Sequence, residues 1–566
     1  MSPSRMVTFL SVSLVGLACG GGKIEDQAKN DQAPPLKSAA PKTADSLPAE
    51  VIAAWEKAGA RLGWVTLENF GDYEFRLGSK GKPGELPVFR FSEWQQGLLR
   101  RLPQPECSFG LILSYTEITD AGLTELAGLK SLQLLNLFNT KVTGTGLRDL
   151  AALNSLQWLG LRKTQATDAG AMQLAGLKSL RWLTLSETGV TSAGMKGLAG
   201  LKSLRTLSLF DTKMTDFGLK DLAGLTSLQE LAIGGSNVTD AGLKELAGLN
   251  SMQRLNLWGT KVTDAGMKDL AGLTSLQRLD LGHTKLTDAG LKELVGLNLM
   301  QSLNLWGTKV TDHGMKDLAR LNSLQTLDLG RTKLTDAGLK ELSGLKSMHT
   351  LNLGDTRVTD AGMKHLAGLK SLQNLDLRLT DVTDIGLADL EGLKSLETLD
   401  LAVTKVSGAG LKHLAGLKSL QILHLSDTDV TDAGLAELAG LKSLKHLNLS
   451  HTKVSGAGLK ELAGLEILSM YSTQATDAGL KEMAGLKYLQ SLSLDETMVT
   501  DGGLKHLAGL QSLYGLSLRK TKITDAGLKE LANLKSLRNL NLEYTQVTEA
   551  GIAKLRMALP AIRVTR

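Results

Sequence analysis

Threonine hydroxyls and aspartate carboxylates are the groups in this sequence whose spacing could support chemistry. A threonine recurs every 24 residues, and positions are counted from it, with the threonine as position 0. Hydroxyls can act as nucleophiles, and a row of carboxylates can bind cations. The threonine stands at Thr116, Thr140, Thr164, Thr188 and Thr212, is replaced by Ser236, and returns from Thr260 to Thr545. An aspartate follows at +4 in most units, as at Asp168, Asp240, Asp264 and Asp525.

A catalytic role does not explain 19 copies, because a reaction needs one nucleophile rather than a row of them. The position 0 threonine is expected to face inward, where its hydroxyl bonds backbone groups of the loop. Position +3 is always Thr or Ser, which predicts a helix N-cap, and the +4 carboxylate would lie at the positive end of that helix. A glycine at +6 in all 19 units predicts close packing where the helix starts.

No arrangement outside this rhythm indicates catalysis. The sequence has no Ser, His and Asp order, no metal cluster, no phosphate-binding loop and no paired carboxylates that stand apart from the repeat. His424 and His446 fall on neighbouring predicted strands but are offset along them, so they are interpreted as surface histidines. We therefore predict no enzyme activity, no cofactor and no metal.

Aromatic and basic residues break the repeat on one predicted face. Two tryptophans stand at −6 on adjacent units, and three further aromatics stand at −2 on alternate units, with glycines between them. Solvent-facing Trp is costly unless it is used, and Trp is enriched at binding hot spots. The predicted ligand-binding residues are Trp158, Trp182, Phe210, Arg254, Trp258, Arg278, His283, Trp306 and Arg331.

The expected surface consists of aromatic ribs with shallow slots at Gly234 and Gly282, open to a protein or another macromolecule. A second interpretation stays open, because residues 248–295 and 296–343 match at 40 of 48 positions. On that interpretation Trp306 is a copy of Trp258 with no role of its own.

Each unit contains the elements that would position these residues. Leu at −5 and −3, such as Leu135 and Leu137, alternates with polar residues, which predicts a strand with one buried face. Leu recurs mostly at +7, +10 and +13, which predicts a short helix. A lone unit cannot offset the entropy of ordering its own backbone, so units must stack as a solenoid. The predicted fold class is α/β, a horseshoe with a parallel sheet on the concave face and short helices on the convex face.

The pattern L-x-x-L-x-L-x-x-N defines leucine-rich repeats, and here Thr stands where Asn is usual. The continuation V-T-D-A-G-L-x-x-L-A resembles the cysteine-containing leucine-rich-repeat subfamily, with Thr in place of its Cys or Asn. The resemblance covers residues 110–566. It implies a horseshoe like that of ribonuclease inhibitor, and it implies no single function.

The first 19 residues have a positive start and an apolar run from Met6 to Leu17 that is too short to span a bilayer. The ending Gly16-Leu17-Ala18-Cys19 resembles a bacterial lipoprotein signal with Cys19 as the lipidated residue, although Gly16 stands where that family prefers Leu. An ordinary cleaved secretion signal is the alternative. Either way we expect export, and lipidation would anchor the chain to a membrane in the cell envelope.

The rest of the chain divides by composition. Residues 20–50 are rich in Ala, Pro, Lys and Asp and are expected to form a disordered tether. Residues 51–109 are expected to form an N-terminal cap, with a helix over 51–62 and a strand followed by a helix within 85–101. Residues 110–552 would carry the repeats, and residues 553–566, with a helix stopped by Pro560, would form a C-terminal cap. Between Thr452 and Thr473 the spacing falls to 21, where a kinked or tightened sheet is expected.

Charge and cysteine content limit the function classes that the sequence allows. The net charge of +6 comes from mixed Lys and Asp rather than from a basic stripe, so nucleic-acid binding is not predicted. Two cysteines provide no disulfide framework.

The leading hypothesis is an exported scaffold that binds a macromolecule on its concave face. A structural envelope or spacer protein without a defined ligand is the alternative. A third possibility, an F-box-like ubiquitin-ligase adaptor, rests on the opening Leu47-Pro48-Ala49-Glu50-Val51-Ile52, which resembles that family.

Overall fold

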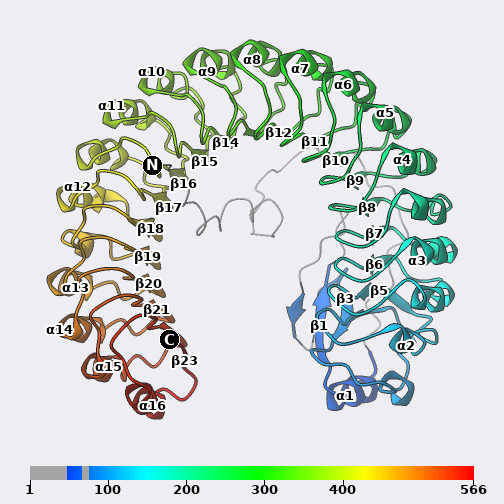
Figure 1. Cartoon of the computed structure of the whole chain (residues 1–566), viewed down its shortest axis with the longest axis horizontal. Coiled ribbons are helices and arrows are strands. Elements are labelled where there is room, and N and C mark those ends of the chain that lie inside the picture. Colours follow the sequence, from blue (N-terminus) through cyan, green and yellow to red (C-terminus); the bar gives the residue numbers. More distant parts are fainter. Residues whose placement is uncertain (1–46, 67–74, 79) are drawn as a thin grey trace, which may run out of the picture. The chain divides into compact units, whose positions relative to one another are not determined.

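The structure is a computed structural model that describes residues 47–66, 75–78 and 80–566, all within one compact unit, Ser46–Arg566. Within this unit each repeat contributes one short strand and one short helix. The strands lie side by side along the inner side and the helices follow one another along the outer side (Figure 1). The predicted α/β solenoid is therefore confirmed. The predicted signal peptide, Cys19 and nearly all of the predicted tether lie outside the described residues.

One sheet runs through all of the described repeats. From β3 onward, neighbouring strands are parallel and follow chain order, whereas β1 pairs antiparallel with both β2 and β3. The strands are β1 (Arg61–Val65), β2 (Arg76–Leu77), β3 (Leu86–Arg90), β4 (Phe109–Ile112), β5 (Leu132–Asn136), β6 (Trp158–Gly160), β7 (Trp182–Thr184), β8 (Thr206–Ser208), β9 (Glu230–Ala232), β10 (Arg254–Asn256), β11 (Arg278–Asp280), β12 (Ser302–Asn304), β13 (Thr326–Asp328), β14 (Thr350–Asn352), β15 (Asn374–Asp376), β16 (Thr398–Asp400), β17 (Ile422–His424), β18 (His446–Asn448), β19 (Ile467–Ser469), β20 (Ser491–Ser493), β21 (Gly515–Ser517), β22 (Asn539–Asn541) and β23 (Arg563–Thr565).

The outer side carries short α-helices, and 3-10 turns extend or replace some of them. The α-helices are α1 (Ala49–Lys57), α2 (Asp120–Leu123), α3 (Asp168–Gln173), α4 (Asp216–Leu222), α5 (Asp240–Leu243), α6 (Asp264–Leu270), α7 (Asp288–Leu294), α8 (Met315–Leu318), α9 (Asp336–Leu342), α10 (Asp360–Met363), α11 (Asp384–Leu387), α12 (Asp432–Glu437), α13 (Asp477–Met483), α14 (Asp501–Leu504), α15 (Asp525–Leu531) and α16 (Glu549–Ala558). None of the described helices has the length and apolar character needed to cross a membrane.

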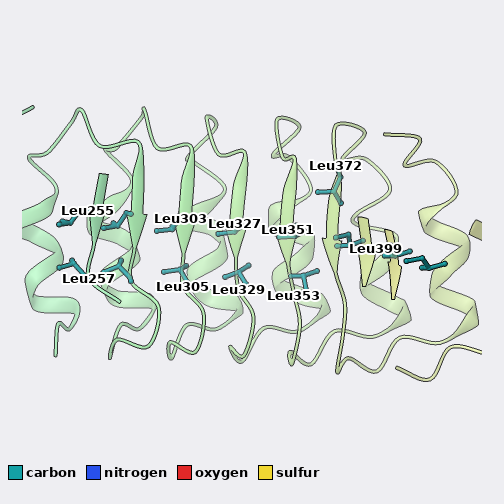
Figure 2. Packing of buried hydrophobic residues seen from close by; sticks show 14 of the residues in the cluster. Leu255, Leu257, Leu303, Leu305, Leu327, Leu329, Leu351, Leu353, Leu372 and Leu399 are labelled. Atoms are coloured by element: carbon teal, nitrogen blue, oxygen red, sulfur yellow. The ribbon is translucent and has the colours of Figure 1, made fainter. Parts of the chain in front are cut away.

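Leucines at −5 and −3 form the inner rows of the core. Leu255 lies within β10 and Leu257 directly follows it, and both are buried. Corresponding pairs on later strands, such as Leu303 with Leu305, stack against them in two rows (Figure 2). Each fully buried leucine contributes roughly 1.5–3 kcal/mol. Because neighbouring units cover both sides of each row, the core is continuous and no single unit needs a core of its own.

The position 0 threonines face inward as predicted. Thr260 is 4% exposed, and its Oγ1 donates to the carbonyl of Leu257 at 2.7 Å, three residues earlier in the same unit. The same bond recurs in other units, for example from Thr284 Oγ1 to Leu281 at 2.6 Å. In these units the hydroxyl therefore closes the turn that follows the strand.

The +4 aspartates do more than stabilise the start of their own helix. Asp240 reaches the next unit, where its Oδ1 accepts the backbone N–H of Thr263 at 2.7 Å and its Oδ2 accepts the Thr263 hydroxyl at 2.6 Å. Thr263 then caps α6 by accepting the N–H of Ala265 at 3.3 Å. The N-cap prediction is confirmed for this unit, and the carboxylate links two units in addition. The +6 glycine makes room for it, because a Cβ on Gly266 would lie 2.6 Å from Asp240 Oδ1.

Units that follow a glycine at +4 lack this link. Thr167, Thr431 and Thr476 make no side-chain cap hydrogen bond, and each follows a unit with glycine at +4. The threonine cap is therefore held in place by the aspartate of the preceding unit.

Removing one such link should weaken the stack measurably. Asp264 accepts from the backbone and hydroxyl of Thr287 at 2.7 and 2.6 Å, so Asp264→Ala is expected to cost about 1–3 kcal/mol of unfolding free energy. The measurement is urea unfolding followed by circular dichroism. Asp269→Ala, in the same helix and without such a link, is the control and should change stability by less than about 0.5 kcal/mol.

The N-terminal segment extends the sheet and covers the first repeat. Leu47, the first described residue, lies inside the predicted tether and yet is buried in the core. The predicted helix over 51–62 is shorter and earlier, since α1 ends at Lys57 and Leu62 lies in β1. Trp55 on α1 stacks on Phe89 of β3 at 4.4 Å, and β3 pairs with β4. The strand expected within 85–101 is present as β3, but only a 3-10 turn, Leu99–Arg101, replaces the helix expected after it.

The short unit leaves the sheet regular, so the expected kink is wrong. Strands β18 and β19 pair in the usual register, with Leu447 opposite Leu468. The missing residues are taken from the outer side, where a 3-10 turn, Leu459–Glu461, replaces the helix. Gly456 and Gly458 there adopt φ values of 105° and 88°, which favour glycine. At the C-terminus α16 stops before Pro560, and β23 pairs with β22 as the closing strand.

Candidate functional site

The residues at −2 and −1 stand in the turn that follows each strand, at the edge of the inner sheet. The backbone at −1 is left-handed, with φ of 55° at His283 and 56° at Arg331. Its N–H donates to the −2 carbonyl of the next unit, as from His283 to Trp306 at 2.7 Å. These turns therefore continue the ladder of the sheet and hold their side chains in rows.

An asparagine or aspartate at −4 fixes this turn in several units, including those of Trp258 and Trp306. Asn256 Oδ1 accepts the backbone N–H of Trp258 at 3.0 Å, and Asn304 Oδ1 accepts that of Trp306 at 2.9 Å. Sequence reasoning missed this row, although Asn and Asp alternating at 24-residue intervals were visible as a signal. The row orients the backbone of Trp258 and Trp306.

The aromatic rings at −2 lie over glycines of the next unit. A Cβ on Gly282 would come within 2.7 Å of Trp258 Cδ1, and a Cβ on Gly330 within 2.6 Å of Trp306 Cδ1. The rings therefore occupy the space above these glycines. The predicted slots between ribs are wrong, because each ring fills the slot beside it.

Phe210, Trp258, His283 and Trp306 form a continuous aromatic layer. The ring centroids are 6.1 Å apart between Phe210 and Trp258, 5.1 Å between Trp258 and His283, and 4.2 Å between His283 and Trp306. The Arg331 guanidinium lies over the Trp306 ring, 5.4 Å from its centroid. The structure thus brings together five of the nine predicted residues.

The surroundings of this layer favour the neutral form of His283, and buried acids lie beneath the rings. Burial lowers the pKa of His283, and the nearby Arg331 charge lowers it further. Beneath the rings, burial raises the pKa of Asp280 to about 6 and also raises the pKa of Asp328. Asp280 Oδ1 accepts the N–H of Gly282 at 3.0 Å, so this carboxyl group supports the turn.

Trp158 and Trp182 do not belong to this layer. Their rings stack at 3.9 Å, and Trp158 is only 6% exposed. Trp158 packs in a second apolar cluster with Val88 of β3, and Trp182 packs against the same cluster. The premise that Trp158 faces solvent is wrong, because strands of the N-terminal segment extend an apolar surface up to it.

Arg254 and Arg278 are paired neighbours on β10 and β11 at the other end of the strands. They stand four residues before the aromatic row, roughly 13 Å along an extended strand. They share the inner face with the layer without completing it.

The other candidate side chains do not form a site within residues 47–66, 75–78 and 80–566. Within these ranges no group of three or more His, Cys, Asp or Glu side chains could hold a metal ion. His424 and His446 lie on the adjacent strands β17 and β18, offset along them as expected. Cys107 is partly buried.

Comparisons with known proteins agree with this architecture. A family model described as a leucine-rich repeat region matches residues 110–336, and one described as a leucine-rich repeat matches residues 344–367, 416–439 and 440–463. Together these matches cover just over half of the chain. No match was found among curated protein sequences.

Solved structures with a similar fold come from bacteria and plants. An internalin from Listeria monocytogenes is 23% identical over 63% of this chain and 89% of its own, with a TM-score of 0.42. A leucine-rich repeat protein of Leptospira interrogans is 23% identical over 81% of this chain and 89% of its own, with a TM-score of 0.38. The ectodomain of the Arabidopsis receptor kinase HAESA, solved with a peptide hormone, is 20% identical over 77% of this chain and 74% of its own, with a TM-score of 0.44.

Proposed function

Because the chain belongs to the leucine-rich repeat proteins, we propose that it is an exported, membrane-tethered scaffold that binds a protein or other macromolecule through the inner face of its sheet. The observation that carries this proposal is the aromatic layer of Phe210, Trp258, His283 and Trp306. These side chains are in mutual contact, and none of the four is fully buried. Aromatic anchors of this kind dominate binding energy at protein surfaces.

The tether is supported by the sequence alone. Residues 1–19 have the pattern of an export signal that ends at Cys19, and a polar segment separates them from the solenoid. Mass spectrometry of the mature chain tests this part, with a diacylglyceryl-modified Cys19 as the expected N-terminus. An N-terminus without acylation would leave secretion in place and remove the membrane anchor.

Truncating Trp258 and Trp306 together is expected to weaken binding while the fold remains intact. In Trp258→Ala with Trp306→Ala, a partner captured by cross-linking on intact cells should lose affinity about 30-fold, the ~2 kcal/mol of a typical hot spot. Affinity is measured with the purified chain and the captured partner, and circular dichroism checks the fold.

Phe217→Ala is the matched control for that experiment. Phe217 is an aromatic residue of the repeats that is 85% exposed, but it lies on α4 on the outer side. It should leave affinity unchanged. Equal affinity of the tryptophan variant and the wild type would remove the binding site from the aromatic layer.

A structural spacer without a defined ligand is the second candidate. The observation in its favour is the match of 40 of 48 positions between residues 248–295 and 296–343, because a tuned site usually diverges further. Proximity labelling on cells separates the two functions. A single enriched partner supports binding, whereas uniform labelling of envelope components supports the spacer.

A further inference from the structure

A row of cations runs beside the aromatic layer. Position +1 is basic in five consecutive units, at Lys261, Lys285, Lys309, Lys333 and Arg357, and all five side chains are exposed. We call these residues the cation row. Within the described part of the chain, none of the five makes an ion pair with an acidic side chain closer than 4 Å. Their charge is therefore available to a partner.

Position +1 is neutralised further along the chain. In those units acids alternate with lysines, and the opposite charges pair between neighbouring units. Lys405 Nζ lies 2.6 Å from Asp381 Oδ1, and Lys453 Nζ lies 2.7 Å from Asp429 Oδ1. The contrast shows that unbroken positive charge at +1 is a property of the units from Thr260 to Thr356, which overlap the aromatic layer, and is not imposed by the repeat.

Side chains at −1 and +1 share one surface. In the later units, Asp427 and His451 at −1 line a shallow hollow together with Asp429 and Lys453 at +1. By the same repeat geometry, His283 and Arg331 at −1 lie next to Lys285 and Lys333 at +1. The aromatic layer and the cation row therefore form one strip along the edge of the sheet.

Backbone hydrogen bonds hold this strip at the spacing of the strands. His283 N–H donates to the Trp306 carbonyl at 2.7 Å, and Lys309 N–H donates to the Leu286 carbonyl at 2.9 Å. One cation is thus presented for every strand, about every 4.8 Å. A partner in register needs negative charges at this interval or at a multiple of it, and flat apolar faces for the rings.

We propose that this strip binds a linear acidic polysaccharide, a chain of sugars that each carry a carboxylate. This inference rests on the proposed function, because it names the partner class of the same inner face. A pyranose ring advances a chain by about the spacing of two neighbouring strands, ~4.8 Å. Neighbouring sugars are rotated about the chain axis, so the carboxylates on one side recur at about every second sugar, each within reach of two neighbouring cations of the row. The C–H face of a sugar packs against the negative face of Trp258 or Trp306.

An acidic peptide fits this spacing less well. Side chains on one face of an extended peptide repeat every second residue, about 6.6 Å, and fall out of register with the row within a few units. Single-stranded nucleic acid would offer flat bases, but it is not the partner we favour. The experiment therefore includes an acidic peptide and single-stranded DNA as competing candidates.

The experiment titrates the full chain with oligogalacturonate by calorimetry at low and high salt. Saturable binding that weakens as salt rises is expected, because exposed charges are screened. Lys285→Gln with Lys309→Gln is expected to weaken binding about five- to twentyfold, from the loss of two exposed charge contacts. Lys405→Gln with Lys453→Gln removes two lysines from the same position whose charges are already paired, and it should change affinity less than twofold.

Three results would overturn the polysaccharide assignment. The first is equal weakening in the two lysine variants. The second is binding of poly-L-glutamate or single-stranded DNA as tightly as oligogalacturonate. The third is no binding of oligogalacturonate while a captured protein still requires Trp258 and Trp306, an outcome that keeps the proposed function and rejects only its carbohydrate partner. Loss of both kinds of binding from the aromatic layer would instead reject the proposed function.

Discussion

Replacing Asp376 by Asn is expected to raise the unfolding free energy at pH 8 by on the order of 3 kcal/mol and to leave it nearly unchanged at pH 4. Asp376 is 6% exposed, and its partner in register on the next strand is Asp400, which is also 6% exposed. The measurement is the midpoint of urea unfolding as a function of pH.

The charges around Asp376 explain the size of this effect. Burial and the neighbouring Asp400 raise the pKa of Asp376 to about 7, and a smaller rise comes from Asp328, against the lowering influence of Arg378. Arg378 Nε lies 3.1 Å from Asp376 Oδ2, yet that oxygen has no partner in hydrogen-bonding geometry. A charged Asp376 is therefore poorly compensated in the fold.

The direction of the pH dependence follows from the raised pKa. In the unfolded chain the pKa of this carboxyl group is near its ordinary value of 3.8, whereas in the fold its pKa is about 7. Between these values the native state holds a proton that the unfolded state has released. This contribution to stability is therefore fully present below about pH 4 and is lost as the pH rises to about 7.

Asparagine suits the site because neighbouring units already use it. Asn256 Nδ2 donates to Asp280 Oδ2 at 3.1 Å, and Asn352 Nδ2 donates to Asp328 Oδ2 at 3.1 Å. Asn at 376 would complete the same pairing with Asp400. Asp381→Asn, an exposed acid paired with Lys405, is the control and should shift stability by at most about 1 kcal/mol. An unchanged pH profile in Asp376→Asn would contradict the assignment.

The repeat made the local features predictable. The strand around Leu255, the inward hydroxyl of Thr260 and the N-cap at Thr263 all follow from residue type at fixed spacing within one unit. Each depends on contacts within a few residues or on the periodic burial of one face, and a sequence displays both. Parallel pairing of the strands followed from stacking such units.

Contacts between units were not predictable in the same way. Asp240 and Thr263 are 23 residues apart, and only the stacking distance brings the carboxylate to the next cap. Trp158 looked like an exposed anchor, but it is covered by an apolar cluster that includes Val88, from a segment without a repeat pattern. The Trp258 ring lies over Gly282 because of its rotamer, which no spacing reveals.

Gly479→Ala is expected to be among the most damaging single-methyl changes in the repeats, at about 3 kcal/mol. Gly479 is the +6 glycine of the unit that follows the short one. A Cβ there would overlap the backbone carbonyl of Ser455 and approach Gly456 Cα at 3.2 Å. At most other +6 positions, such as Gly266, the obstacles nearest the added Cβ are side-chain atoms, which can move.

Backbone also stands nearest the added Cβ at Gly170 and Gly434, which likewise follow a unit with glycine at +4, but the overlap is closest at Gly479, beside the short unit. Three residues are missing before β19, yet β18 and β19 keep the standard register, so the shortening is taken up on the outer side. The preceding unit also has Gly456 at +4 in place of aspartate, and its backbone comes directly against Gly479. A methyl group at Gly479 can then be accommodated only if this backbone moves. The sheet on one side and the neighbouring helix on the other hold that backbone in place.

Gly485→Ala, in the same unit and with no heavy atom within 4 Å of the added Cβ, is the matched control and should be neutral or slightly stabilising. Equal unfolding midpoints for the two variants would show that the outer side of the short unit yields freely, and that register alone is maintained there.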